Sequence, residues 1–343
     1  MVFKREDVLD PEYLPPTLPH RESEIKQIAS NLLPAASGRK PINTFIFGPP
    51  GIGKTACIKY VFREFEKFSG LRTIYINCWE FNTSLAVLSE ITLSLGFFVQ
   101  RRGWAKDEVI SRLIEAINKT GSVIVCLDEV DQLIKKDDSV LYDLLRMKQF
   151  VKFPIGLVFI SNDPFVFSHV EPRIKSSLGL DEIEFKPYSF LEMKDILEER
   201  AKEAFLDFEK AAISLAANHA IKNGGDVRIG LEVLLKAGRM AEREGSKKLL
   251  ARHVKSVLEK VGKVKPKIVV EKLNEHERIL VKILKGRKKP LKIAELYERY
   301  VKKIKKPVGE RMIRNYLKHL EECGLVKMEK KGKEILVKYE ERF

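Results

Sequence analysis

The sequence predicts an α/β domain with a mostly parallel sheet, followed by a helical domain and a C-terminal winged helix-turn-helix domain. Three observations support this prediction. Short β-rich runs alternate with longer amphipathic stretches over residues 42–186, helical periodicity alone continues to about residue 262, and the last 81 residues hold most of the net positive charge. Alternating strands and helices are typical of a parallel sheet covered by helices. We therefore expect domains at residues 1–186, 187–262 and 263–343.

The composition is that of a globular protein and excludes several other classes. Of 343 residues, 44% are hydrophobic and 32% are charged, which excludes collagen-like, low-complexity and wholly disordered chains. No stretch approaches the ~18 uncharged apolar residues of a membrane helix. Charged residues at positions 4–7 precede any apolar run, which argues against a secretory signal. We expect a soluble cytoplasmic protein with no membrane partner.

Four cysteines and six histidines are scattered along the chain without the spacing of a zinc module or a disulfide framework. Cys57, Cys78 and Cys126 stand in apolar surroundings. We interpret them as small buried hydrophobic residues of a reducing compartment.

Five short apolar runs are the candidate strands of the α/β domain. Their near-continuous apolar character is typical of strands that are covered on both faces. The helical segment that follows is interrupted by glycines at 224, 225 and 245, which indicate breaks between helices. The expected strands are Thr44–Phe47, Thr73–Asn77, Val123–Leu127, Leu157–Ile160 and Glu182–Phe185.

A glycine-rich loop follows the first expected strand. Its sequence, Gly-Pro-Pro-Gly-Ile-Gly-Lys-Thr, fits the phosphate-binding pattern G-x-x-x-x-G-K-[ST] and opens a helical run. Glycines let backbone N–H groups close around phosphates, and a helix N-terminus favours the anion. We expect Lys54 to reach the β- and γ-phosphates of ATP and Thr55 to place its hydroxyl on Mg²⁺. The expected nucleotide-binding residues are Gly48, Pro49, Pro50, Gly51, Ile52, Gly53, Lys54, Thr55 and Ala56.

Polar side chains follow the third and fourth expected strands. The run Val123–Leu127 ends abruptly in Asp128 and Glu129, which is typical of a nucleotide hydrolase. In that interpretation Asp128 holds Mg²⁺ and Glu129 orients and deprotonates the attacking water. Asn162 follows the next strand and can position the same water, although an asparagine after a strand is also an ordinary turn residue.

Several further segments resemble one family. Leu127–Asp131, Ile160–Asp163, Glu171–Leu178 and Gly225–Arg228 occur in order at suitable spacing, after an entry segment from Val8 to Glu22. Together they resemble the archaeal origin-recognition-complex/cell-division-control replication initiators, a branch of the AAA+ ATPases. The resemblance runs from about residue 8 to 262 and is looser beyond.

The resemblance implies roles for individual residues. Asn162 is implied to be the first sensor and Arg228 the second, which reaches the γ-phosphate from a helical lid. Arg173 matches the region where the family places the arginine offered to a neighbour's nucleotide, and the alternative is a structural pair with an acid such as Asp181. His20 and Arg21 match the segment that lies near adenine in relatives.

The resemblance also implies an initiator helix or hairpin between the second and third strands that touches DNA. Residues 81–104 occupy that position, with Arg101 and Arg102 as its basic candidates. An amphipathic helix of the core would explain most of this stretch equally well.

The C-terminal segment carries the charge excess and a winged-helix pattern. The whole chain has 63 basic and 48 acidic side chains, a net charge of +15. Residues 263–343 hold 25 of the basic and 12 of the acidic side chains. The first helical pattern begins near Asn274, and two further patterns follow, one with Ile293, Leu296, Tyr297 and Tyr300 and one with Ile313, Tyr316, Leu317 and Leu320. Two strand-like runs, Leu325–Glu329 and Glu334–Tyr339, then flank a lysine-rich turn. Three helices followed by a hairpin form the plan of a winged helix-turn-helix. A basic module of this kind predicts double-stranded DNA as a partner and nucleoid association.

One face of the third helix in this module is predicted to read DNA. At ~100° per residue its basic and amide side chains share a face opposite the apolar residues, so this face is free to enter a major groove. Contact with phosphates alone is the alternative. The wing is expected to meet phosphate only. The expected DNA-binding residues are Arg311, Arg314, Asn315 and Lys318 on the helix and Lys330, Lys331 and Lys333 on the wing.

These observations predict an ATP-binding, slowly hydrolysing initiator that binds origin duplex DNA and helps load a replicative helicase. Assembly with other initiator protomers on DNA is implied only by the resemblance. The origin and the helicase come from the resemblance alone. Two alternatives stay open: a nucleotide-switched DNA-binding regulator with little or no turnover, and a related AAA+ remodelling or defence ATPase.

Overall fold

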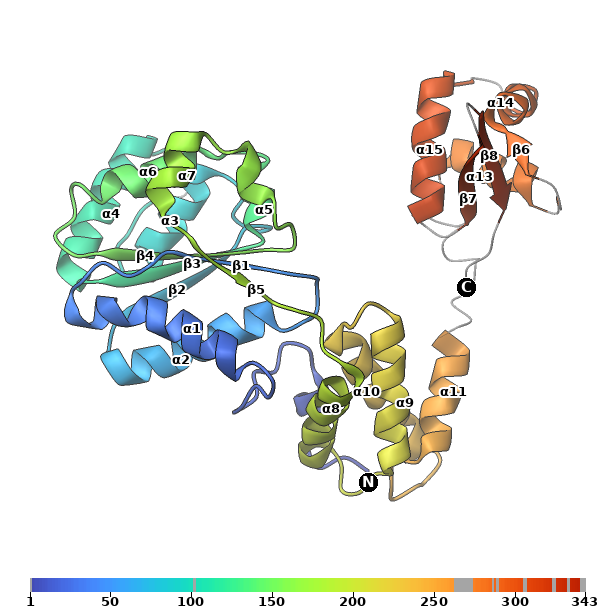
Figure 1. Cartoon of the computed structure of the whole chain (residues 1–343), viewed down its shortest axis with the longest axis horizontal. Coiled ribbons are helices and arrows are strands. Elements are labelled where there is room, and N and C mark those ends of the chain that lie inside the picture. Colours follow the sequence, from blue (N-terminus) through green and yellow to red (C-terminus); the bar gives the residue numbers. More distant parts are fainter. Residues whose placement is uncertain are drawn as a thin grey trace. The chain divides into compact units, whose positions relative to one another are not determined.

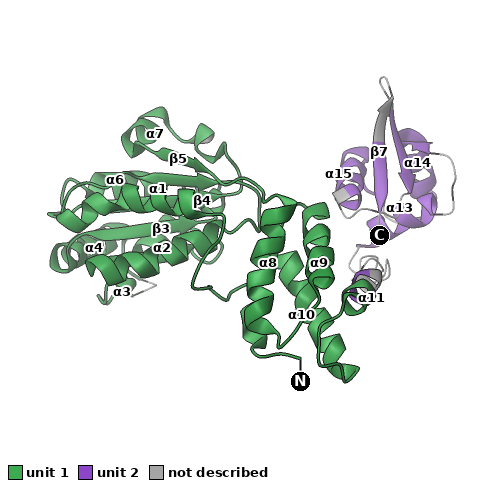
Figure 2. Ribbon diagram, turned by 60° about the horizontal axis from the view of Figure 1, so that its bottom comes forward, with its two compact units in different colours: residues 1–255 green, residues 256–343 purple. Residues whose placement is uncertain are grey.

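Two compact units make up the chain, Met1–Lys255 and Ser256–Phe343 (Figure 2). The division falls within helix α11 (Ala251–Val261). The computed structural model describes residues 2–100, 103–261, 274–285, 287, 290–304, 307–322, 325–331 and 334–339.

A five-stranded parallel sheet forms the centre of the first unit (Figure 1). Its order is β2-β3-β4-β1-β5, so β4 lies between β3 and β1 and brings three strand ends together at one edge. All five predicted strands are confirmed, with bounds that differ by at most two residues. The strands are β1 (Thr44–Phe47), β2 (Arg72–Asn77), β3 (Val123–Asp128), β4 (Ile155–Ser161) and β5 (Asp181–Glu184).

Helices cover both faces of this sheet (Figure 1). The strands β3 and β4 are buried along their whole length, which explains why their sequences lack polar alternation. One face carries α1 (Glu22–Leu32) and α2 (Lys54–Ser69). The other carries α3 (Ser84–Ser94), α4 (Lys106–Thr120), α6 (Ser139–Met147) and α7 (Pro172–Leu178), and the short α5 (Val130–Ile134) follows β3.

A helical lid follows the sheet within the first unit. Its helices are α8 (Phe190–Ala204), α9 (Lys210–Lys222) and α10 (Val227–Arg243), followed by α11. Ser189 caps α8, since its hydroxyl accepts from the backbone N–H of Glu192 while the Glu192 carboxylate accepts from the N–H of Ser189.

The N-terminal segment packs on this lid, although the sequence analysis places it in the α/β domain. The ring of Phe3 stacks on Phe205 with 5.0 Å between centroids, and the backbone N–H of Lys4 donates to the carbonyl of Ala204. The 3₁₀ helix η1 (Glu6–Leu9) continues along the lid helices. Its few apolar residues are too widely mixed with charges to show a period in the sequence.

After α11, the described residues of the second unit form three helices and a small antiparallel sheet, which confirms the predicted winged-helix plan. The helices are α13 (Glu275–Leu284), α14 (Ile293–Val301) and α15 (Glu310–Glu322), and the strands are β6 (Leu291–Lys292), β7 (Val326–Lys331) and β8 (Glu334–Tyr339). The two-residue β6 pairs with β8 and was not predicted, because so short a strand leaves no alternation to recognise.

The wing hairpin is longer on one side than predicted. Strand β7 runs through Lys331, two residues past the expected end at Glu329, because Lys330 and Lys331 pair with Ile335 and Glu334. The side chains of both lysines, and the whole of Lys333, lie outside the described residues. Within the described ranges, every helix is too short or too polar to cross a bilayer.

Packing of the N-terminal segment on the lid gives a stability prediction. A Cβ at Gly238 would lie 2.3 Å from Phe3 Cζ and 2.6 Å from Phe205 Cε1, inside a ring stack. Gly238→Ala should therefore lower the free energy of unfolding by ~1–3 kcal/mol through overpacking. Thermal unfolding followed by circular dichroism measures the effect.

Gly230→Ala is the matched control on the same helix. The atoms nearest to its Cβ belong to the one side chain of Leu197, at 2.7 Å from Cδ1, rather than to two stacked rings. Both variants gain the same helix propensity, about 1 kcal/mol, so this gain cancels in the comparison. We expect a smaller loss of stability there. Equal losses in the two variants would contradict this account of the packing.

Candidate functional site

The glycine-rich loop connects β1 to α2 at the carboxyl edge of the sheet. Gly51 and Gly53 have φ of +71° and +89°, in the left-handed region that favours glycine. The helix α2 begins at Lys54, so its first N–H groups and the positive end of its dipole face the loop. This backbone is suited to hold phosphate.

Lys54 is buried in the loop with its ammonium group fully engaged. Its Nζ donates to the carbonyls of Gly48 and Pro49, both at 2.7 Å, and to Oδ1 of Asn162 at 2.8 Å. Burial lowers the pKa of Lys54 to about 8, although the charges of Glu129 and Asp128 oppose this shift. The ammonium is therefore charged at neutral pH, and it must exchange some of these acceptors to bind an anion.

Asp128 ends β3 with a carboxylate held by three donors. Oδ2 accepts from the hydroxyl of Thr55 at 2.6 Å and from the phenol of Tyr75 at 2.7 Å, while Oδ1 accepts from the backbone N–H of Glu129. Thr55 and Asp128 offer the hard oxygen ligands that Mg²⁺ prefers, close enough to share one ion. The pair fits the expected metal site.

Tyr75 was missed by the sequence analysis. Burial, reinforced by the charge of Asp128, raises the pKa of Tyr75, so its hydroxyl stays a donor. A tyrosine within a strand is an ordinary residue, and only the pairing of β2 with β3 places it near Asp128.

Glu129 and Asn162 meet beside Lys54. Nδ2 of Asn162 donates to Oε2 of Glu129 at 3.1 Å, while Oδ1 of the same amide accepts from Lys54. Burial, and next the charge of Asp128, raises the pKa of Glu129 above its ordinary value. Glu129 also has φ of +53°, a conformation that costs energy in a residue other than glycine and is concentrated at functional sites.

The lid reaches the loop through the start of α10. The backbone N–H of Val227 donates to the carbonyl of Gly51 at 3.0 Å. Arg228 is 55% exposed and pairs with Asp226, its Nη2 lying 2.6 Å from Oδ2. Burial alone would favour the neutral acid, but hydrogen bonds from Arg228 outweigh it and keep the pKa of Asp226 below its ordinary value.

Arg21 is hydrogen-bonded to the backbone of the phosphate loop. Its guanidinium donates to the carbonyls of Ile52 and Lys186, to Glu24, and to the hydroxyl of Tyr188, and its carbon lies 4.0 Å from the centroid of the Tyr188 ring. The neighbouring His20 pairs instead with Asp195 of the lid, at 3.3 Å. Contact of either residue with a base stays a prediction.

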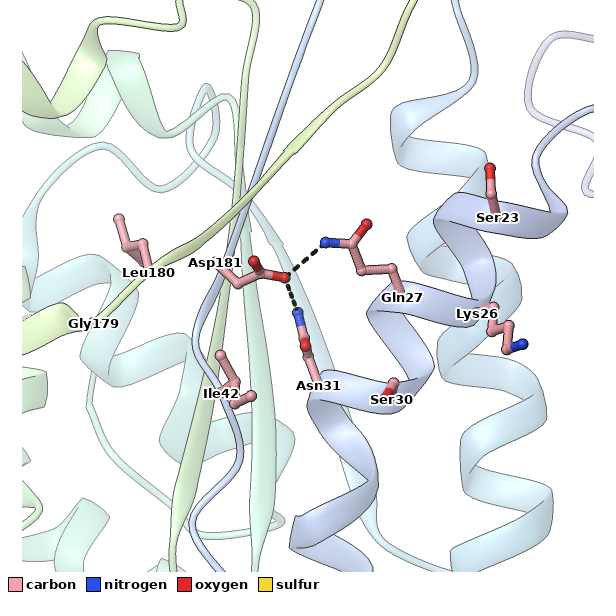
Figure 3. Close-up of a pocket in the computed structure, with 9 residues that line it drawn as sticks. All are labelled: Ser23, Lys26, Gln27, Ser30, Asn31, Ile42, Gly179, Leu180 and Asp181. Atoms are coloured by element: carbon pink, nitrogen blue, oxygen red, sulfur yellow. Dashed lines mark hydrogen bonds between the residues drawn. The ribbon is translucent and has the colours of Figure 1, made fainter.

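Arg173 is exposed on α7 and has no hydrogen bond or ion pair from its side chain to any other residue in the described ranges. Asp181, the acid suggested as its structural partner, instead accepts through Oδ2 from the amides of Gln27 and Asn31, at 2.9 and 2.7 Å (Figure 3). Asp181, Gln27 and Asn31 line a surface pocket between α1 and β5. Arg173 remains available to another molecule.

The expected reading face lies on α15. Arg311, Arg314, Asn315 and Lys318 are all exposed, while Ile313, Leu317 and Leu320 on the opposite face are buried. Arg314 pairs with Glu310 at 3.6 Å. The helix is anchored to α13, since Nδ1 of His319 lies 2.7 Å from Oε1 of the buried Glu277. The other basic candidates, Arg101 and Arg102, lie outside the described residues.

The three cysteines with described surroundings are buried, as the sequence analysis expects. Burial raises the pKa of both Cys57 and Cys78 to about 12, so neither is an ionised nucleophile at neutral pH.

Comparison with known proteins identifies the family. The chain is 35% identical to the ORC1-type DNA replication protein of Thermococcus kodakarensis, over 95% of this chain and 84% of that protein. The chain belongs to the ORC1-type DNA replication proteins. It is also 34% identical to the corresponding protein of Pyrococcus abyssi, over 95% of this chain and 83% of that one.

Family and structural matches agree with this assignment. Residues 39–163 match the AAA domain and residues 194–259 match the Cdc6 AAA+ ATPase-type lid domain. The structure of the Aeropyrum pernix ORC1 protein in complex with DNA superposes with a TM-score of 0.80 at 31% identity, covering 99% of this chain and 94% of that one. The resemblance to the archaeal replication initiators is therefore confirmed.

The lowered pKa of Lys54 predicts how nucleotide affinity depends on pH. Below pH 8 the ammonium is charged in the free protein, and above it the proton is lost and must be regained to pair with phosphate. The affinity for ADP should thus fall as pH rises above 8, approaching about tenfold per pH unit. Titration with a fluorescent ADP analogue at several pH values measures this slope.

Lys54→Arg is the control, because a guanidinium stays charged throughout this range. Its affinity should be nearly independent of pH, whatever its absolute value. An identical slope in the two proteins would assign the titration to another group.

Proposed function

We propose that the protein is an ATP-dependent DNA replication initiator that binds origin duplex DNA, with slow ATP hydrolysis as its switch. The observation that carries the proposal is a single hydrogen-bonded network. It links Lys54 through Asn162 to Glu129, and Thr55 to Asp128 beside it. These are the phosphate-binding, water-activating and metal-binding groups of a nucleotide hydrolase at one sheet edge.

Each group has a part in the proposed hydrolysis. Mg²⁺ bound by Thr55 and Asp128 would neutralise phosphate charge. The raised pKa of Glu129 brings this carboxylate closer to the basicity that a general base needs, and its hydrogen bond from Asn162 fixes where it points. Lys54, released from part of its carbonyl contacts, would pair with the phosphates.

Two arginines are proposed to sense the nucleotide from outside this network. Arg228 would contact the γ-phosphate from the lid, and its approach is supported by the position of α10 against the loop. Arg173 would reach the nucleotide of a neighbouring protomer on DNA, which its exposed side chain supports.

DNA binding is proposed for the second unit. The ORC1 protein of Aeropyrum pernix was solved with DNA, and the similarity covers nearly all of this chain. The four exposed polar residues of α15 would enter the major groove, and the wing lysines would contact phosphate. Arg101 and Arg102 stay proposed as further DNA contacts.

The remaining proposals follow from the family. The protein would act in the cytoplasm on the nucleoid and help to load a replicative helicase. The domain boundaries at 186/187 and 262/263 are kept as proposed.

Glu129→Gln tests the hydrolytic part. The amide cannot accept the proton of water, so turnover should fall by roughly 10²–10⁴-fold while ATP affinity stays within about twofold of the wild type. ATP turnover and binding are measured with and without duplex DNA. Glu182→Gln, on the exposed outer strand, is the control and should behave like the wild type.

The same measurement tests the role of Glu129 and the alternative of a nucleotide-switched regulator. Wild-type-like turnover in Glu129→Gln would remove Glu129 as the base. A wild type that binds ATP and DNA without any turnover would instead favour the nucleotide-switched regulator.

Arg314→Ala tests the reading helix. If Arg314 bonds a base edge, the loss should be ~1–3 kcal/mol on a specific duplex and much less on a random one. Arg299→Ala removes the same charge from an exposed site on α14 and should weaken neither complex selectively. Binding isotherms for both variants on both duplexes measure the difference. Equal losses for Arg314→Ala on the two duplexes would contradict base reading by α15.

A further inference from the structure

The carboxylate of Asp226 lies directly against the phosphate loop. A Cβ built on Gly51 would come within 2.0 Å of Oδ1 of Asp226 and 1.9 Å of its Cγ. The adjacent Val227 N–H bonds the carbonyl of Gly51. No side chain other than hydrogen fits at position 51 while the lid is in this place.

The same carboxylate holds Arg228 by one edge of its guanidinium. Nε donates to Oδ1 at 2.9 Å and to Oδ2 at 3.1 Å, and Nη2 donates to Oδ2 at 2.6 Å. Within the described ranges no acceptor bonds Nη1 of Arg228, so that side of the planar group is left for another anion. Asp226 also accepts from the backbone N–H of Arg228, as the N-cap of α10.

We propose that Asp226 is a positioning residue that orients Arg228 over the phosphate loop for the γ-phosphate. This inference rests on the proposed function and deepens it, since it assigns the residue that makes Arg228 an effective sensor. A long exposed arginine loses rotamer freedom when it binds phosphate, and a partner that already fixes its conformation reduces that loss. Asp226 is itself fixed by Gly51 and by the start of α10.

Three other roles of Asp226 predict different outcomes. As a helix cap alone, it would be replaced without effect by asparagine, which caps equally well. As a partner that withholds Arg228 from the nucleotide, its removal would increase the preference for ATP. If Asp226 acted only through its negative charge near the phosphates, its removal would strengthen ATP binding more than ADP binding, with or without Arg228.

A double-mutant cycle separates these effects. Isothermal titration gives the dissociation constants of ATP and ADP, with Mg²⁺, for the wild type, Asp226→Asn, Arg228→Ala and the double variant. We expect each single variant to reduce the preference for ATP over ADP at least threefold. In the Arg228→Ala background, Asp226→Asn should cause no further reduction, because there is no arginine left to position.

Asp207→Asn is the matched control. It removes an exposed lid carboxylate that pairs with Lys248 at 3.0 Å, and it should leave the ATP/ADP preference unchanged. Thermal unfolding of all variants shows whether the lid is intact.

Other outcomes would overturn the inference. An unchanged or increased ATP preference in Asp226→Asn, or an equal reduction with and without Arg228, would exclude positioning. If Arg228→Ala lowers the preference and Asp226→Asn does not, only this inference fails. If the wild type binds neither nucleotide, the proposed function fails and this inference with it.

Discussion

A buried ammonium group organises the nucleotide site. Lys54 loses its hydration on entering the loop, and this loss is offset by oxygens from the loop and from Asn162 after β4, and by the charges of Glu129 and Asp128. Because Asn162 in turn binds Glu129 after β3, the position of one cation fixes three strand ends relative to each other. The strand order, with β4 between β3 and β1, makes this possible.

The loop is also where the other parts of the first unit meet. Arg21, from the entry segment, bonds the carbonyl of Ile52 in the loop and that of Lys186 where the chain leaves the sheet. The lid bonds Gly51 from the other side. If the loop moves on binding an anion, the entry segment and the lid would therefore move with it. The hydrogen bonds transmit this displacement, whereas apolar packing would let the segments slide past the loop.

Sequence reasoning recovers what depends on local pattern. The loop, the five strands and Asp128, Glu129 and Asn162 follow from motif spacing and from runs of apolar residues. It misses Tyr75 and the contact of Asp226 with the phosphate loop, which arise only when distant segments meet, and it does not predict that the N-terminal segment packs on the lid. The apolar residues of that segment are too few to indicate a partner, and its place is shown by the ring stack of Phe3 on Phe205 and the hydrogen bond from Lys4 to Ala204.

Charged side chains are mostly paired at the nucleotide site of the first unit, whereas those on α15 of the second unit are exposed to solvent. At the nucleotide site nearly every charge already has a partner within the protein, so a phosphate must exchange one partner for another and binding can be selective. On α15 the basic groups stand in solvent, where the ion pair of Arg314 with Glu310 is long and weak. A surface of that kind binds a polyanion by releasing counterions, and its affinity depends steeply on salt. Selectivity there must come from the arrangement of Arg311, Arg314 and Asn315 along one helix, which the contact of the exposed His319 with the buried Glu277 ties to α13.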